Sequence, residues 1–290
     1  MSESFSLIGA SRVGVSLAYN LTKIGFSPEF IWNRSEKNLC KATDIIPFKN
    51  SSTNLYDFQY ESKWIIISVT DDAIRPIAEK LSKIRTNFQN TKVFHLSGFR
   101  SSDILSALEE KGAITGAFHP VLSIPNIHDG IKTIKSAVFT CQGKLQNELL
   151  KITEKLGTTG IPITARQKQA IHISAVFLNN YATSLIYTVK QKCLTQKISI
   201  NNIELLLQKI SKQAIENGWQ RKDLSDILTG PLIRGDTGII KEHLAFLDNF
   251  PGLKKLYSDF GLLTAKKINI DKVDIEKILK IFNESKEKDG

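Results

Sequence analysis

Residues 5–14 read FSLIGASRVG, and this stretch decides the fold of the first half of the chain. The apolar run Phe5 to Ile8 predicts a strand, and the apolar spacing of Arg12 to Ile24 predicts an amphipathic helix. The turn between them has the pattern GxSxxG. In a dinucleotide-binding fold the first glycine permits a tight turn, the middle one lets backbone approach the pyrophosphate, and the third lets the helix pack on the strand. We therefore predict either a turn without a ligand or, as we adopt, a cofactor phosphate at the helix N-terminus, bound by Gly9, Ser11, Arg12, Val13 and Gly14.

Short apolar runs and helical stretches alternate through this half of the chain. Trp64 to Val69 (WIIISV) is continuously apolar, which is typical of a strand that helices cover on both faces. The alternation predicts an α/β domain with a doubly wound, mostly parallel sheet. The further strands expected are Glu29 to Trp32, Lys92 to Leu96, Ile114 to Phe118, Ser136 to Cys141 and Thr158 to Ile163, and the further helices are Asp72 to Ile84, Ser102 to Lys111 and Lys144 to Leu156.

The character of the sequence changes after Pro162. Gln167 to Lys192 contains no Gly or Pro and has apolar residues at a helical period, so it predicts one long helix. The sequence therefore predicts an α/β dinucleotide-binding domain at 1–163 and an all-α domain at 164–290. The shorter helices expected are Ile203 to Asn217, Leu224 to Leu228, Thr237 to Leu247, Leu253 to Lys267 and Asp274 to Lys286.

The length, charge and hydropathy of the chain exclude several classes of protein. Its 290 residues fit two domains, and a 41% hydrophobic content argues against a disordered chain. The net charge of +10 is spread, with 19 basic and 15 acidic residues in 1–163 and 20 and 14 in 164–290. A nucleic-acid-binding surface would cluster such charge, so nucleic-acid binding is only a lesser alternative. No apolar run approaches the roughly 18 residues of a membrane span, and no signal-peptide pattern is present, so we expect a cytoplasmic protein with no membrane partner.

The cysteines and histidines do not indicate a metal site. Cys40, Cys141 and Cys193 are odd in number and have no CxxC spacing, so we expect buried, reduced thiols. No set of His, Cys and Asp residues has zinc-ligand spacing, and no GxSxG motif is present. Metal catalysis and serine hydrolysis are therefore not expected.

The end of the second strand, Trp32-Asn33-Arg34-Ser35, indicates which dinucleotide binds. An acidic residue usually accepts hydrogen bonds from the adenosine ribose hydroxyls at this position, and its carboxylate would repel a 2′-phosphate. An arginine with hydroxyl and amide donors beside it would bind that phosphate. We therefore predict NADP(H), with Asn33, Arg34 and Ser35 at the 2′-phosphate. The alternative is an exposed loop arginine beside a helix cap.

Further residues are expected at the sheet edge where ligands collect. Val69, Thr70 and Asp71 follow the buried strand, although Asp71 or Asp72 can serve only to cap the next helix. His95-Leu96-Ser97-Gly98 ends one expected strand, and Phe118-His119-Pro120 ends the next. The residues predicted to contact the cofactor here are Val69, Thr70, Asp71, Ser97 and Gly98.

The order of the motifs resembles that of a known two-domain family. The helical half contains Gln169-Ala170-Ile171-His172-Ile173-Ser174-Ala175-Val176, then Asn179-Asn180-Tyr181, and later Gly230-Pro231-Leu232-Ile233-Arg234-Gly235-Asp236 followed by His243. With the glycine turn, this set is similar over nearly the whole chain to proteins that join a Rossmann-like domain to the C-terminal domain of unknown function 2520. That family resembles ketopantoate reductase, pyrroline-5-carboxylate reductase and the β-hydroxyacid dehydrogenases, and the chain departs from it at Ser11, where Gly is more frequent. The resemblance implies an NADP-dependent oxidoreductase without fixing its substrate.

The long helix is expected to carry catalytic residues. Lys168, His172 and Asn179 are separated by four and seven residues, so they share a helix face within about 40°. Hydride reduction of a carbonyl or an imine requires a proton, which Lys168 or His172 can supply, and an amide can hold the substrate oxygen. Helix geometry favours Asn179 for that role, whereas the family pattern favours Asn180, which we adopt. The catalytic residues predicted are His172, Lys168, Asn180 and His119.

The loop residues Arg234 and Asp236 have two interpretations. Arg234 can bind a substrate carboxylate through two nitrogens, which places both residues at a substrate site. The two can equally form an internal ion pair that fixes the loop against His243. For His95 and His243 the plainer interpretation is a hydrogen-bonded, partly buried ring.

These features together predict an NADP(H)-dependent reductase or dehydrogenase. Its substrate would be a small, anionic keto, hydroxy or imino compound bound in a cleft between the two domains. The first alternative is a sensor that binds NADP(H) without turnover. Long helices such as Ile203 to Ile210 carry more apolar surface than the core of a single subunit can cover. We therefore expect a homodimer.

Overall fold

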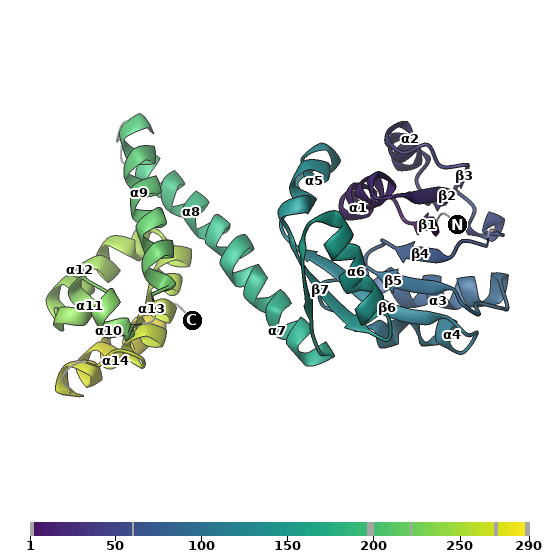
Figure 1. Cartoon of the computed structure of the whole chain (residues 1–290). Helices are drawn as coiled ribbons and strands as arrows, with labels where there is room; N and C mark the ends of the chain where they lie inside the picture. Colours follow the sequence, from purple (N-terminus) through teal and green to yellow (C-terminus); the bar gives the residue numbers. More distant parts are fainter. Residues whose placement is uncertain (1–2, 60, 196–199, 221, 270–271, 288–290) are drawn as a thin grey trace. The chain divides into compact units, whose positions relative to one another are not determined.

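The computed structural model of the chain describes residues 3–59, 61–195, 200–220, 222–269 and 272–287. The chain divides into two compact units, 1–185 and 186–290. The first unit contains the α/β structure expected at 1–163 and the beginning of the long helix that follows it (Figure 1). The change from α/β to helical structure therefore comes before the end of the first compact unit.

An eight-stranded sheet forms the centre of the first unit, in the order β3-β2-β1-β4-β5-β6-β7-β8. Every pair of neighbouring strands is parallel except β6 and β7, which are antiparallel. In such a doubly wound sheet, ligands bind outside the carboxyl ends of the strands where the order reverses, here between β1 and β4. The strands are β1 (Glu3–Ile8), β2 (Phe26–Trp32), β3 (Asn50–Ser52), β4 (Trp64–Ile67), β5 (Lys92–His95), β6 (Ile114–Val121), β7 (Val138–Gly143) and β8 (Thr159–Pro162).

Helices cover both faces of the sheet (Figure 1). One face is covered by α1 (Arg12–Lys23), α2 (Glu36–Ile45), α5 (Ile127–Thr133) and α6 (Gln146–Leu156). The other face is covered by α3 (Asp71–Ile84), a 3-10 turn (Ser102–Leu105) and α4 (Ser106–Glu109). Residues of β4 contribute to both apolar clusters, which is why all four are buried. The predicted fold class is confirmed for this half of the chain.

The long helix begins at Ala165 and is interrupted once. Thr164 and Gln167 form a capping box at its start. The helix runs as α7 (Ala165–Ala175), a π-helical turn (Val176–Tyr181) and α8 (Ala182–Thr195). The prediction of helix over 167–192 is confirmed, but a single regular α-helix is wrong, because the π-helical turn changes the angular phase of every residue after 175.

The second unit is helical, as predicted. Its core contains Ile240, Leu244, Ala265, Ile278 and Phe282. Among the described residues, no helix is both long enough and apolar enough to cross a membrane. The helices are α9 (Ile200–Gly218), α10 (Leu224–Ile227), α11 (Pro231–Arg234), α12 (Thr237–Phe246), α13 (Pro251–Ala265) and α14 (Lys272–Glu287).

Two local expectations are wrong. The stretch 102–111 is not one helix, since a 3-10 turn precedes the four-residue α4. Cys40 is exposed on α2, whereas Cys141 is buried as expected; the side chain of Cys193 lies outside the described residues.

Candidate functional site

The turn after β1 requires both of its glycines. Gly9 has a φ of +99°, and a Cβ on it would lie 2.3 Å from the carbonyl oxygen of Ser68. A Cβ on Gly14 would lie 2.3 Å from Ser68 Oγ. The turn and α1 therefore pack directly against the residue that follows β4, which is the close approach that this fold requires of its glycines.

Ser11 occupies the position of the middle glycine and caps α1. Its Oγ accepts a hydrogen bond from Gly14 N (3.1 Å) and bonds to Ser68 Oγ (2.5 Å). The backbone N–H groups of Ser11, Arg12 and Val13 have no acceptor among the described residues. Free N–H groups at the positive end of a helix dipole form an anion site, so the turn fits a cofactor phosphate.

The loop after β2 contains one residue that is held by hydrogen bonds, Asn33, and two potential donors that are not, Arg34 and Ser35. Asn33 Oδ1 accepts from Ala10 N (3.1 Å), and Asn33 Nδ2 donates to Ser35 O (2.9 Å). Asn33 therefore ties this loop to the glycine turn. Arg34 is exposed and has no ion-pair partner among the described residues, and the Ser35 hydroxyl makes no cap hydrogen bond. Arg34 and Ser35 are thus free to contact a phosphate.

The residues after β4 lie against the glycine turn. A side-chain carbon of Val69 is 2.7 Å from where a Cβ of Gly9 would be. Thr70 is the N-cap residue of α3, and its side chain makes no cap bond. Asp71, in the first turn of α3, accepts a hydrogen bond from Ser97 Oγ (2.8 Å). This bond joins the ends of β4 and β5 at one edge of the sheet.

His95 supports the turn that follows β5. The ring is fully buried; its Nδ1 accepts from Ser97 N (3.2 Å), and its Nε2 donates to Ser101 O (3.0 Å). Burial lowers the pKa of His95 to about 4, although the bond to Ser101 opposes the shift. The ring therefore stays neutral near pH 7 and keeps both bonds, as in the plainer interpretation of this residue.

Gly98 lies between two imidazole rings. A Cβ on Gly98 would be 2.4 Å from His172 Nδ1 and 2.8 Å from His119 Nε2. The two ring centroids are 6.1 Å apart, and the ring of Phe99 packs 6.0 Å from that of His172. The structure thus brings together the turn after β5, His119 of β6 and His172 of α7.

The backbone sets the tautomer of His119. Its Nδ1 lies 3.0 Å from the carbonyl oxygen of Leu96, which can only accept, so Nδ1 carries the proton. Burial, with the charge of Lys168 as the next contribution, lowers the pKa of His119 to about 4. The ring is therefore neutral at pH 7. Its Nε2 carries a lone pair, and no described residue donates to it.

Lys168 is a buried amine without a partner. Its side chain is 1% exposed, and Nζ makes no hydrogen bond with the described residues. Burial lowers the pKa of Lys168 to about 8, while Asp71 and Cys141 oppose that shift. The amine is therefore mostly protonated at pH 7. A buried charge without a partner destabilises a fold, and such groups concentrate at functional sites.

The structure does not bring the predicted amides to this cluster. Asn179 and Asn180 lie in the π-helical turn, are exposed, and bond to each other through Asn179 Nδ2 and Asn180 Oδ1 (3.1 Å). A helix rises by 1.5 Å per residue, which places Asn180 about 18 Å along the axis from Lys168. One small molecule cannot contact both residues of the same chain at that separation.

The charged loop of the second unit is paired internally. Arg234 Nε and Nη2 donate to Asp236 Oδ2 at 3.0 and 2.9 Å. His243 does not join them, because its Nδ1 bonds to the Tyr257 hydroxyl (2.9 Å).

In the first unit, the side chain of Arg12 is already paired, because it donates to the carbonyl oxygen of Pro125 (2.7 Å). The backbone N–H of Arg12, and not its side chain, therefore remains free at the glycine turn.

Some participants in the cluster are not apparent in the sequence. No motif surrounds Phe99 or Cys141. The two hydrogen bonds of the His95 ring depend on the path of the backbone from 97 to 101, which the sequence does not reveal. Burial raises the pKa of the Cys141 thiol to about 12, which the Lys168 charge opposes. No group of three or more His, Cys, Asp or Glu residues in the described parts of the chain could hold a metal ion.

The fold and the cluster define a Rossmann-type unit with titratable groups at the carboxyl edge of its sheet. The chain matches the Rossmann-like domain family over residues 2–120 and the family described as Domain of unknown function (DUF2520) over residues 137–264. It belongs to the proteins that join these two domains, as its motifs indicated. The second match begins at the start of β7, so the last two strands belong to the DUF2520 match.

Solved structures share the fold at low sequence identity, which shows the fold alone. A candidate NADP oxidoreductase from Bacteroides fragilis is 20% identical with a TM-score of 0.73, over 91% of this chain and 97% of that one. A pyrroline-5-carboxylate reductase from Coxiella burnetii is 14% identical, with a TM-score of 0.54 over 99% and 98%. The NADP-bound pyrroline carboxylate reductase of Plasmodium falciparum is 12% identical, with a TM-score of 0.56 over the whole of both chains. No curated protein sequence matches the chain.

Proposed function

We propose that the chain is an NADP(H)-dependent oxidoreductase that transfers hydride to or from a small, anionic keto, hydroxy or imino compound. The observation that carries the proposal is the buried amine of Lys168, which has no hydrogen-bond partner among the described residues. A pKa of about 8 suits this amine to supply the proton that hydride transfer to such a compound requires. The same edge carries the phosphate-binding turn after β1. Oxidoreductases among the solved structures of this fold support the proposal.

The turns around the carboxyl edge suit the parts of NADP(H) in order. The N–H groups of residues 11–13 would hold the pyrophosphate, and Arg34 with Ser35 would hold the 2′-phosphate. Residues 69–71 and 97–98 follow β4 and β5 at the same edge and would contact the nicotinamide half of the cofactor. When bound, the cofactor supplies the hydride. The protein's part is to hold the substrate and to exchange the proton, for which Lys168 and His172 are available.

The preference for the phosphorylated cofactor is testable on Arg34. Arg34→Ala should weaken NADPH binding by about 10–100-fold, because it removes a charge-assisted bond to the 2′-phosphate, and should leave the weaker binding of NADH unchanged. Fluorescence titration of both cofactors against both proteins measures this. Lys151→Ala removes an exposed charge from α6 and serves as the matched control.

Equal binding of NADPH and NADH to the unaltered chain would contradict the role of Arg34. Tight NADPH binding without oxidation or reduction of any hydroxy, keto or imino compound would instead favour the non-catalytic sensor. Neither result would affect the assignment of the glycine turn, which concerns the pyrophosphate common to both cofactors.

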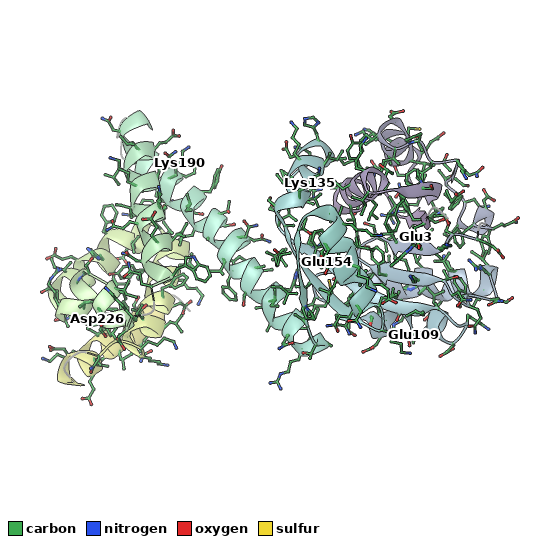
Figure 2. The ribbon with its side chains drawn as sticks, in the orientation of Figure 1. Glu3, Glu109, Lys135, Glu154, Lys190 and Asp226 are labelled. Atoms are coloured by element: carbon green, nitrogen blue, oxygen red, sulfur yellow. The ribbon has the colours of Figure 1, made fainter. Side chains whose placement is uncertain are left out.

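We also propose that two copies of the chain associate through the second unit. A groove of about 620 Å³ between α8 and α9 has an apolar lining that includes Ile186, Leu207 and Ile215, and Lys190 (labelled in Figure 2) pairs with Glu204 there. On α9, Leu206 is 50% exposed and Ile210 is 57% exposed. Apolar surface of this kind favours association.

Size-exclusion chromatography with light scattering tests the dimer. The unaltered chain should have twice the mass of one chain, and Leu206→Glu with Ile210→Glu should shift it to a single chain, because two buried carboxylates would remain without partners. Lys241→Glu changes an exposed residue of α12 and should leave the mass unchanged. A monomeric unaltered chain at micromolar concentration would contradict the proposal.

A further inference from the structure

A polar groove of about 560 Å³ lies at the amino edge of the sheet, where β4 and β5 begin. It is lined by Gln59 and Glu61, which precede β4, and by residues between Ile84 and Asn90, which connect α3 to β5. Each of these two strands has four residues, so about 13 Å of strand separates the groove from the carboxyl edge. A molecule bound in the groove is therefore not the substrate of the proposed hydride transfer.

Arg85 lines the groove and is fixed by its own turn. Nε donates to the carbonyl oxygen of Asn87 (2.7 Å), Nη2 donates to Thr91 Oγ1 (3.2 Å), and the guanidinium lies 4.8 Å from the ring centroid of Phe88. The third nitrogen, Nη1, is buried and has no hydrogen-bond partner among the described residues. In the same parts of the chain, no carboxylate forms an ion pair with Arg85. The guanidinium is thus held in one orientation with a nitrogen that requires an acceptor.

Further donors line the same groove. The backbone N–H groups of Thr86, Asn87 and Asn90 make no hydrogen bond with the described residues. Asn87 Oδ1 already accepts from Gln89 N (2.9 Å), so the side chain of Asn87 has only its Nδ2 donors left for a ligand. A fixed guanidinium beside several free N–H groups favours a phosphate, which offers three oxygens, over a carboxylate, which offers two.

The charge of this part of the chain also favours an anion. From Lys80 to Lys92 the sequence contains basic residues and no acidic residue. Lys83 lies in the last turn of α3, and Lys92 begins β5, so both lie at the amino edge with Arg85. Glu61 is the carboxylate among the residues that line the groove, and its side chain is exposed.

The groove is larger than a single inorganic anion requires. Its volume lies within the range of sites for small organic molecules, about 300–1,000 Å³. The rest of its lining includes the amides of Gln59, Gln89 and Asn90 and the carboxylate of Glu61. Amides and carboxylates exchange hydrogen bonds with hydroxyl groups. We propose that the groove binds a sugar phosphate, with its phosphate at Arg85 and its hydroxyls at Gln59 and Glu61.

Titration calorimetry on the full chain without cofactor tests this site. The probes are glucose 6-phosphate and ribose 5-phosphate, compared with inorganic phosphate, glucose and glucuronate. At least one sugar phosphate should bind about 10-fold or more tightly than inorganic phosphate and than glucuronate, because it uses both parts of the groove. Glucose should give no measurable binding. Inorganic phosphate distinguishes a site for the free anion from a site for its ester, and glucuronate distinguishes phosphate from carboxylate.

Amide NMR spectra of the ¹⁵N-labelled chain locate the bound sugar phosphate. The N–H resonances of Thr86, Asn87 and Asn90 should shift as the site fills. Those of Ser11, at the glycine turn that is proposed to hold the cofactor, should not shift in the same range of concentration.

Variants separate the two parts of the groove. Arg85→Met removes the charge and should weaken binding of the sugar phosphate and of inorganic phosphate by about 10-fold or more. Glu61→Ala changes an exposed side chain, so the fold is retained; it should weaken the sugar phosphate by about 3–10-fold and leave inorganic phosphate unchanged. Lys151→Met and Arg34→Ala each remove an exposed positive charge elsewhere and should change neither affinity.

The inference is wrong if neither sugar phosphate binds more tightly than inorganic phosphate, if glucuronate binds as tightly, or if Arg85→Met leaves the affinity unchanged. Loss of binding in Arg34→Ala, with shifts at Ser11, would also overturn it, because the molecule would then occupy the proposed cofactor site. None of these measurements involves NADPH or turnover. Failure of the proposed function is therefore a separate result and would leave the sugar phosphate site intact.

Discussion

Lys168→Met should make the chain more stable and much less active. Methionine fills the same volume without a charge, so the free energy of unfolding should rise by about 1–3 kcal/mol, or about 3–8 °C in melting temperature. Carbonyl reduction should fall by about 10²–10⁴-fold, because the proton donor is lost. A residue that costs stability and supports activity is the expected signature of a functional site.

The same residue predicts how stability and rate depend on pH. The pKa of Lys168 is about 8 in the folded chain and 10.5 in the unfolded chain, so the unfolded chain binds more protons between these values. Stability due to this group therefore rises with pH across that window. Reduction requires the protonated amine, so its rate should fall as the pH rises through about 8. Thermal melts and rates from pH 6 to 10 measure both, and Lys168→Met should lose both dependences.

Lys151→Met on α6 is the control for these measurements, because it removes an exposed amine of the same size. It should change the melting temperature by little and the rate not at all. A Lys168→Met protein that melts at a lower temperature, or that keeps its activity, would contradict the assignment of an unpartnered catalytic ammonium.

Gly98→Ala should separate cofactor binding from catalysis. The added Cβ would lie 2.4 Å from His172 Nδ1 and 2.8 Å from His119 Nε2, so both rings must move. Displacement of positioning groups by such distances costs about 100-fold in rate, and the overpacking should cost about 1–3 kcal/mol of stability. The glycine turn after β1, proposed to hold the pyrophosphate, is not touched, so NADPH binding should weaken much less than the rate falls.

Kinetics and NADPH titration on the Gly98→Ala protein test this expectation. Gly252→Ala is the matched control, because nothing lies within 4 Å of a Cβ at that position of α13. An unchanged rate for Gly98→Ala would show that His119 and His172 do not act on the substrate. A parallel loss in Gly252→Ala would attribute the effect to general destabilisation.

The strands and helices that the sequence predicted are those with a clear apolar pattern. Elements that it did not predict bury little: α2 has only Leu39 and Ala42 buried, and none of the three residues of β3 is buried. The sequence also predicted that β6 ends at Phe118, whereas the strand continues to Val121 and includes Pro120. Proline is normally excluded from a central strand. Pairing with β5 stops at Ala117, however, so Pro120 has a neighbour only in β7 and its missing N–H is harmless.

Some features of the candidate site could be predicted from the sequence, and others could be found only from the structure. The glycine turn is local, so the residues alone predict a phosphate site at the start of α1, and the motif order alone indicates the two domains. The hydrogen bond between Ser11, the cap of α1, and Ser68 could be found only from the structure, because Ser11 follows β1 and Ser68 follows β4. The separation of Asn180 from Lys168 also required it, because a helical face in sequence says nothing about distance along the axis.

Local sequence was therefore sufficient for the α/β class, the helical second half and the glycine turn after β1, since each depends on neighbours along the chain. Only the folded chain decided that Lys168 is buried without a partner and that His119 is a neutral acceptor whose ring lies by Gly98 and His172. Those properties come from the meeting of β5, β6 and α7, whose contacts bury the polar groups and shift their pKa values. Burial and pairing are properties of surroundings, and no residue type carries them by itself.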